Sequence, residues 1–316
     1  MQFSTKIPLN DINFTIDYNS KILLLGSCFS ENIGNKFKYF KFQTEINPFG
    51  IIFNVVSLEK LLNRVVHKLY FTEKDLFYHN DLWHCFEVHS ELSHPNKEIF
   101  LEQLNEKIST THHAILELTH CFITLGTSWV YENRTTNNVV ANCHKVPQKQ
   151  FKKVLLSSEQ NGVSLKKIVA LISSINPKVN FIFTVSPVRH IKDGFFENNV
   201  SKGNLFSALH QSFNFNETKV VYFPSYEIVM DELRDYRFYE KDMLHPNQLA
   251  IDYVWERFSE CCFSTATCQF MKEIDAIQKS LSHRPLNPTT EAHQLFLDKI
   301  TVKIEKIKTK LSHLQF

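Results

Sequence analysis

The stretch KILLLGSCFSENIG, residues 21–34, combines a short apolar run, a glycine and the start of a helical pattern. Lys21–Leu25 contains four consecutive aliphatic residues and runs into Gly26, which is typical of a strand buried on both faces. Ser27 follows the glycine, and a helical pattern covers residues 31–39. A strand that leads into a helix through Gly-Ser indicates the start of a βαβ unit, with the serine at the carboxyl edge of a sheet.

Apolar runs of the same kind recur along the chain of 316 residues, at Cys121–Leu125, Phe181–Val185 and Val220–Pro224. Helical patterns separate them, at residues 31–39, 57–67, 97–118, 164–175, 205–213 and 247–258. Buried strands that alternate with helices are typical of a parallel sheet. The sequence therefore predicts an α/β fold with helices on both sides of a parallel sheet.

Two segments interrupt this alternation. Residues 75–90 alternate polar and apolar side chains around Asn80-Asp81, and residues 131–147 combine a polar turn with a β-prone pair. Both patterns predict β-hairpin insertions, near residues 70–93 and 131–147. Because insertions near strand ends often shape a pocket, we expect them to lie beside a functional site.

The C-terminal segment, residues 264–316, has a different pattern from the rest. Apolar residues recur at helical spacing up to Leu281, and the stretch HRPLNPTTE, residues 283–291, then breaks the helix with two prolines. Apolar residues three and four apart follow from residue 297 to residue 314. The pattern predicts a helical hairpin with a coiled-coil seam, outside a domain of residues 1–263. The seam either packs on its own domain or forms a homodimer interface.

Composition restricts the function classes. The 35 basic and 33 acidic residues leave a formal charge of +2, which gives no electrostatic argument for a nucleic-acid partner. The N-terminal stretch lacks a signal-peptide pattern and no apolar run reaches the length of a bilayer, so we expect a cytoplasmic protein without membrane insertion. The seven cysteines form no CxxC pair and the fifteen histidines no HxxxH pair, so we predict no disulfide framework, no metal and no cofactor.

Three residues form a candidate catalytic triad. Ser27 would lie at the sheet edge beside free N–H groups of a helix. Asp242 and His245 precede a helix that Asn247 would cap, and their spacing lets the carboxylate hold one imidazole nitrogen while the other faces a pocket. The alternatives are a helix cap at Ser27 and a solvated turn at residues 242–245. With Ser27 facing the pocket, we expect its neighbour Cys28 to face the core or the helix flank as a small hydrophobe.

Six stretches in order carry a family resemblance: GSCFSENIG, NPFGIIFN, TLGTSWVY, NCHKVP, TVSPVRHIKDG and DELRDYRFYEKDMLHPNQLA. From about residue 22 to residue 258 the chain resembles the GSCFA family, a branch of the SGNH (GDSL-like) hydrolases. The resemblance implies a flavodoxin-like α/β sandwich in which Ser27 is the nucleophile, with Asp242 and His245 completing the triad.

The resemblance also implies an oxyanion hole built from the N–H groups of Ser27 and Gly50. An asparagine usually completes it, but this chain has LGTSWVY where the wider superfamily has Gly-x-Asn-Asp. We take the amide of Asn142 as the replacement donor, with Thr127 and Ser128 as the next candidates. The alternative for Asn142 is a turn-stabilising role.

Arg189 and His190 follow the third apolar run at the same sheet edge, which makes them either substrate contacts or solvated loop charges. The candidate triad and the resemblance together predict a serine-dependent ester hydrolase of the SGNH type, and analogy with the superfamily suggests an acetylated carbohydrate as substrate. The alternatives are an O-acyltransferase with the same triad and a non-catalytic binding module on the same fold.

Overall fold

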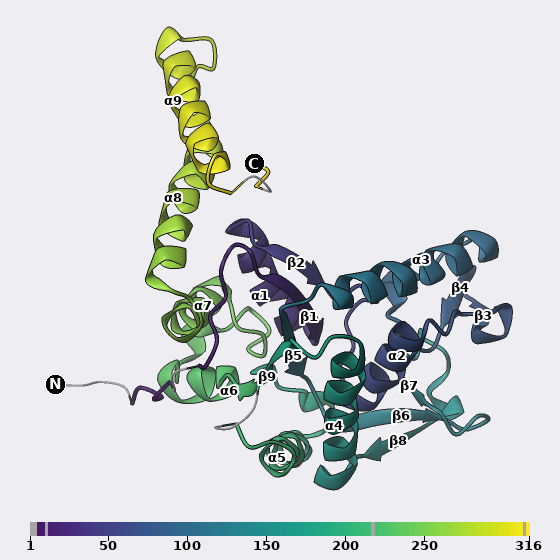
Figure 1. Cartoon of the computed structure of the whole chain (residues 1–316). Coiled ribbons are helices and arrows are strands. Elements are labelled where there is room, and N and C mark those ends of the chain that lie inside the picture. The colour runs from purple at the N-terminus through teal and green to yellow at the C-terminus, as the bar shows by residue number, and fades with distance from the viewer. Residues whose placement is uncertain (1–4, 10–11, 216–218, 312–313) are drawn as a thin grey trace.

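The computed structural model describes residues 5–9, 12–215, 219–311 and 314–316. Its centre is a sheet of five strands, all paired in parallel, in the order β10-β9-β5-β1-β2 (Figure 1). The strands are β1 (Lys21–Gly26), β2 (Gln43–Ile46), β5 (His120–Leu125), β9 (Asn180–Val185) and β10 (Val220–Tyr222). Counted in chain order, this is the 2-1-3-4-5 arrangement of flavodoxin-like folds, so the predicted α/β class is confirmed.

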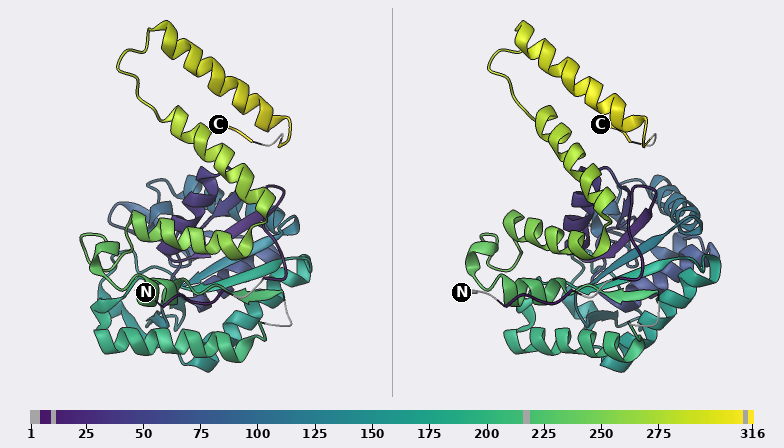
Figure 2. Two further views of the ribbon diagram at one scale, coloured as in Figure 1. Left: turned by 90° about the vertical axis from the view of Figure 1, so that its left-hand side faces the viewer. Right: turned by 60° about the vertical axis from the view of Figure 1, so that its left-hand side comes forward.

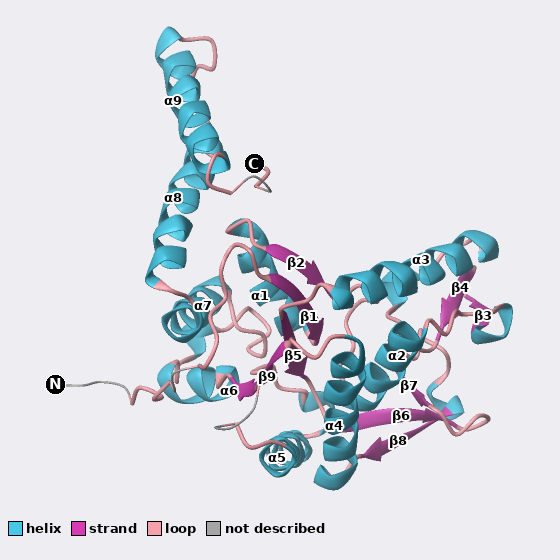
Figure 3. Ribbon diagram, in the orientation of Figure 1, coloured by secondary structure: helices cyan, strands magenta, loops and turns pink. Residues whose placement is uncertain are grey.

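Helices cover both faces of this sheet (Figure 3). They are α1 (Cys28–Tyr39), α2 (Val55–His67), α3 (Lys97–Leu116), α4 (Ser158–Ile175), α5 (Phe195–Ser212), the single turn α6 (Ser225–Glu227) and α7 (Gln248–Cys262). Leu23 and Leu25 of β1 pack in one cluster with α2, α3, α4 and α5, whereas Ile22 and Leu24 pack in another with α1 and α7. This alternation is what a strand buried on both faces requires, because successive side chains point to opposite faces.

The strand β2 does not appear among the predicted apolar runs. Its four residues, QTEI, are all only half-buried, and it pairs with β1 alone because it lies at the edge of the sheet. An edge strand with mixed polarity lacks the continuous apolar run on which the prediction depended.

Both predicted insertions form β-structure. The first is the hairpin of β3 (Leu76–His79) and β4 (Leu82–Cys85), whose turn residues Asn80 and Asp81 have φ of 46° and 60°. The second is larger than predicted: β6 (Trp129–Asn133) pairs with β7 (Val139–Val140) and also with β8 (Phe151–Leu155), which follows the predicted segment.

The C-terminal segment forms the predicted pair of helices, α8 (Thr265–Leu281) and α9 (Glu291–Lys308), which project from the α/β body (Figure 2). Ile300 and Ile307 of α9 are buried in one cluster with Met271, Ile274 and Ile277 of α8. The inward side of the seam therefore packs within the chain. Within the described residues, no helix has the length and apolar character needed to cross a bilayer.

Candidate active site

The turn at the end of β1 requires a glycine. Gly26 has φ of +119°, and a Cβ there would lie 2.1 Å from the carbonyl oxygen of Thr124. The Gly26 N–H donates to Asn47 Oδ1 at 2.9 Å, which ties this turn to the loop after β2. The close approach of β1 to β5 thus fixes where α1 begins.

A cleft of about 720 Å³ opens at the carboxyl ends of β1, β5 and β9. Its walls come from the start of α1, the loop before α2, the β6–β7–β8 sheet, and the loops that follow β9 and precede α7. The strand order reverses between β1 and β5, and ligands of open α/β sheets bind at such a switch point. The second insertion lines this cleft as predicted, while the first does not contribute to its described lining.

His245 lies in this cleft and is paired with Asp242. His245 Nδ1 is 2.6 Å from Asp242 Oδ2, and Asp242 Oδ1 accepts from the backbone N–H groups of Leu244 and His245 at 2.9 and 3.0 Å. The backbone N–H of His245, followed by its imidazole and the N–H of Leu244, lowers the pKa of Asp242 to about 2. The carboxylate therefore stays ionised and holds Nδ1 protonated, which leaves Nε2 as the basic nitrogen.

Arg189 braces the loop that carries this pair. Its Nη2 donates to the carbonyl oxygen of Met243 at 2.6 Å, and its guanidinium lies over the rings of Tyr239 and Tyr236, 5.4 and 5.9 Å from their centroids. Met243 has φ of 60°, a strained conformation that this bond helps to hold. Arg189 also lines the cleft, as predicted for a substrate contact; its Nη2 is bound to Met243, and its buried Nε has no hydrogen-bond partner among the described residues.

His190 lines the cleft as an uncharged imidazole. Burial lowers its pKa to about 4, and the nearby positive charges of Lys202, His245 and Lys153 act in the same direction. Its backbone N–H donates to Asn198 Oδ1 at 2.9 Å, and its Nε2 is buried without a hydrogen-bond partner among the described residues. A neutral imidazole with one free nitrogen can hydrogen-bond a substrate oxygen.

Three of the predicted oxyanion donors are occupied by other bonds. The N–H of Ser27 donates to Thr124 O at 3.1 Å, and the N–H of Gly50 donates to Asn47 O at 2.7 Å within a turn where Gly50 has φ of 75°. Ser128 is fully buried, with its N–H and hydroxyl bound to Ser201. All of these groups are already hydrogen-bonded within the protein, so none is free to bind an oxyanion in this structure.

The other two predicted donors reach the cleft. Thr127 lines it, with its Oγ1 2.9 Å from the hydroxyl of Ser201 and accepting from the N–H of Trp129 at 3.0 Å. Asn142 lines it from the second insertion, and its Oδ1 accepts the N–H of His144 at 2.8 Å. That bond shows the turn role, and it leaves the Nδ2 group as the part of the amide that remains for a ligand.

Cys28, and not Ser27, is the residue at the start of α1 that reaches the cleft. Ser27 is 1% exposed, its Oγ caps the helix by accepting the N–H of Phe29 at 3.3 Å, and it is not part of the described cleft lining. Cys28 is half-buried and lines the cleft. The expected core position of Cys28 is therefore wrong, whereas the alternative position at the flank of α1 is compatible with a half-buried side chain in the cleft wall.

A fully buried lysine beneath the cleft was not predicted. Lys202 of α5 donates from Nζ to the carbonyl oxygens of Gly126 and Ser186, at 2.8 and 2.7 Å, and so bridges the ends of β5 and β9. Burial lowers its pKa to about 7, and nearby Cys28 acts in the opposite direction. The signal was present in the sequence, since Lys202 extends the helical face of Leu205 and Leu209 by one turn.

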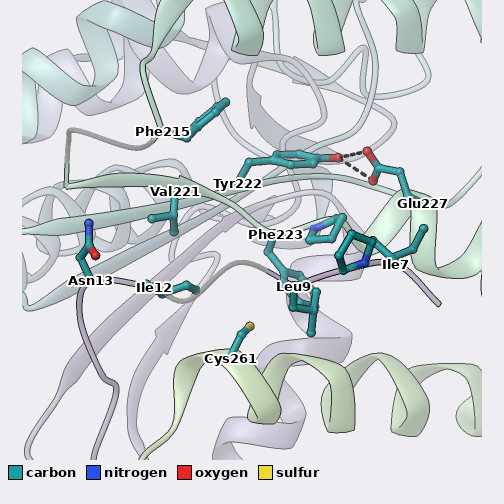
Figure 4. Close-up of a pocket in the computed structure, with 12 residues that line it drawn as sticks. Ile7, Leu9, Ile12, Asn13, Phe215, Val221, Tyr222, Phe223, Glu227 and Cys261 are labelled. Carbon is teal, nitrogen blue, oxygen red and sulfur yellow. Dashed lines mark hydrogen bonds between the residues drawn. The ribbon is translucent and has the colours of Figure 1, made fainter.

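A second cavity of about 350 Å³ lies between the N-terminal segment and β10 (Figure 4). Its only described carboxylate, Glu227, accepts from the hydroxyl of Tyr222 at 2.8 and 3.0 Å. Its described lining includes Cys261 but no histidine, so it lacks the pairing of groups found in the cleft.

The protein is therefore of the α/β class, with a doubly wound parallel sheet and a His–Asp pair in the cleft at its switch point. The chain belongs to the GSCFA family, whose model matches residues 21–258. A second model, described as "GSCFA domain protein, C-terminal domain", matches residues 274–316.

Among solved structures, a carbohydrate esterase family 3 protein from Talaromyces cellulolyticus is similar at 8% identity and a TM-score of 0.36, over 80% of this chain and 99% of that chain. A likeness this distant carries no argument about chemistry. No match was found among curated proteins.

Proposed function

We propose that this protein is an acyl-transfer enzyme that hydrolyses ester bonds, with O-acetylated carbohydrates as its substrate class. The observation that carries the proposal is the 2.6 Å contact between Asp242 Oδ2 and His245 Nδ1 at the mouth of the cleft. A histidine held in this way can accept a proton from a nucleophile and return it to a leaving alcohol.

The cleft walls support a carbohydrate substrate. Trp129, Tyr131 and Phe151 supply aromatic faces, which cover the apolar faces of sugar rings, and Asn142 and Gln148 add amides that can bind hydroxyl groups. Lys153 lies over the rings of Trp129 and Tyr131, at 4.8 and 5.8 Å from their centroids, and pairs with Asp193. This wall mixes flat apolar surface with directional polar groups.

The test is turnover of p-nitrophenyl acetate and of O-acetylated sugars by the full chain and by His245→Gln. Removal of the base should reduce kcat/KM by at least about a thousandfold, as deletion of a triad member does. The control is His210→Gln, which changes an exposed histidine at the far end of α5 and should leave turnover unchanged.

Two outcomes would replace the proposal. Transfer of the acetyl group to an added sugar in preference to water would make the protein an O-acyltransferase. Binding of acetylated sugars with equal turnover in wild type and His245→Gln would leave a binding module on an enzyme-like fold.

A further inference from the structure

The residue that attacks the substrate is a separate question from the base. Ser27 and Cys28 are adjacent at the end of β1, and each could supply a nucleophile. The Ser27 side chain is committed to capping α1 and is almost fully buried, whereas the Cys28 side chain lines the same cleft as His245. We propose that Cys28 is the nucleophile of this cleft, with His245 as its base and Asp242 as the residue that orients His245. This inference rests on the proposed function and specifies its covalent intermediate.

The surroundings of Cys28 favour a thiolate that forms during the reaction. Burial raises the pKa of the Cys28 thiol and Glu31 acts in the same direction, so the resting group is protonated and needs a base. Lys202 and the backbone N–H groups of Cys28 and Phe29 act in the opposite direction. Once the proton leaves, the negative sulfur lies at the positive end of the twelve-residue helix α1 with the Lys202 ammonium nearby.

The proposed reaction balances with water as the only co-substrate. Cys28 Sγ attacks the ester carbonyl carbon while its proton passes to His245 Nε2. The C–O bond to the sugar then breaks, the imidazolium gives its proton to the departing alcohol, and an acyl thioester remains on Cys28. Water attacks the thioester and gives a proton to His245, the C–S bond breaks, and the thiol is restored with release of the acid.

His190 has a position that suits the oxyanion of these steps. Its neutral ring lines the cleft, and its buried Nε2 has no other partner among the described residues. Its nearness to both Lys202 and His245 is reflected in their effect on its pKa. His190 and the Asn142 amide would then stabilise the oxyanion in place of the N–H groups of Ser27 and Gly50, which are already bonded to backbone carbonyl groups.

The chain offers two matched controls. Cys143 also lines the cleft, but from the insertion wall, where burial raises the pKa of its thiol to about 11. Ser27 is the immediate neighbour of Cys28, so its substitution changes the same turn of α1 without removing the thiol.

The experiment compares Cys28→Ala, Cys28→Ser, Ser27→Ala and Cys268→Ala for turnover of p-nitrophenyl acetate and for melting temperature. Both Cys28 variants should lose at least about a thousandfold in kcat/KM. Cys268→Ala changes a half-buried cysteine of α8 outside the described cleft lining and should stay near wild type. Ser27→Ala should retain turnover within about threefold and lower the melting temperature by about 2–4 °C through loss of the cap. The near-isosteric Cys28→Ser separates loss of the thiol from loss of the fold. Normal turnover in folded Cys28→Ala, or inactivity of Ser27→Ala in the folded state, would overturn the assignment.

Alkylation by iodoacetamide keeps this inference separable from the proposed function. If wild type cleaves no ester, the proposed function fails, but Cys28 can still be tested as a thiol activated by His245. Peptide mapping should show Cys28 alkylated at least about tenfold faster than Cys143, and His245→Gln should slow Cys28 by about tenfold. Equal rates at the two cysteines, or no effect of His245→Gln, would remove Cys28 from the site.

Discussion

The α/β body and the C-terminal hairpin bury their apolar side chains to very different extents. Every residue of β5 is buried, and the strands beside it are nearly as enclosed. By contrast, only Ile300 and Ile307 are buried among the eighteen residues of α9. A sheet packed on both faces can hold functional side chains in one geometry. A helix that buries only two apolar side chains is held less rigidly. We therefore expect the chemistry to depend on the body alone, and substitutions can test that division.

The largest expected effect is that of Asp242→Asn in the body. Asparagine keeps an oxygen that can accept the N–H groups of Leu244 and His245, so the loop should remain folded. The amide nitrogen that replaces Oδ2 cannot accept from His245 Nδ1, so the imidazole loses the tautomer that leaves Nε2 basic. Turnover should fall by about a thousandfold to ten-thousandfold, with a nearly unchanged melting temperature. Steady-state kinetics and thermal unfolding on one preparation check both, and wild-type turnover would contradict the role of Asp242.

A smaller effect is expected for the Asn142 amide. Asn142→Asp keeps the oxygen that accepts the His144 N–H but replaces the donor with a second oxygen. If Nδ2 serves the oxyanion, turnover should fall by about a hundredfold to a thousandfold with substrate affinity and melting temperature retained, because the bond strengthens only in the transition state. Asn142→Ala, which removes both functions, should add a loss of stability. A drop in melting temperature with normal turnover in both variants would leave Asn142 with the turn role alone.

The sequence predicts the strands of the sheet more completely than it predicts the residues of the site. Continuous apolar runs locate β1, β5, β9 and β10, because burial on both faces leaves no room for polar side chains. The half-buried β2 and β8 carry mixed patterns and were missed. The Asp242–His245 pair was predicted because its spacing alone brings the two side chains together.

The sequence does not show which of the two adjacent residues, Ser27 or Cys28, faces the cleft. Successive helical residues point about 100° apart, so the residue that reaches the cleft depends on where the first turn of α1 begins. That point is set by the approach of Gly26 to Thr124 of a strand about a hundred residues later in the chain. The burial of Lys202 depends likewise on two carbonyl groups supplied by other strand ends.

Acid should weaken the body more than the hairpin. Burial lowers the pKa of His120, His144 and His190 to about 4 each, whereas His283 and His293 of the hairpin are not buried. When folding lowers the pKa of a histidine, the unfolded state binds the proton at a higher pH than the folded state does, so acid favours the unfolded state. The free energy of unfolding should therefore fall as pH drops below about 6.5 and level off for these groups near pH 4, with up to about 3 kcal/mol lost per histidine.

Urea unfolding between pH 7.5 and pH 4 measures this loss. His120→Gln removes one of these groups and should reduce the loss between pH 7.5 and pH 4 by up to about 3 kcal/mol. The comparison fails if the free energy of unfolding does not change over this range, or if acid melts α8 and α9 before the body.

The smallest effects are expected in the hairpin, and they test its separation from the body most directly. Ile300 is 4% exposed and packs against α8, so Ile300→Ala should weaken the hairpin by about 2–4 kcal/mol. Hydrogen exchange should accelerate within residues 265–308 while kcat/KM stays unchanged, since no residue of α8 or α9 is in the described lining of the cleft. Val302 is 68% exposed on the same helix, and Val302→Ser should stay within about 0.5 kcal/mol of wild type.

Sedimentation of the same two variants tests the predicted homodimer. A dimer interface on the outward side of α9 would be weakened by Val302→Ser. An interface on the inward side would need the surface that Ile300 already buries against α8. If either substitution lowered kcat/KM, the hairpin would be coupled to the cleft and the division between the two regions would not hold.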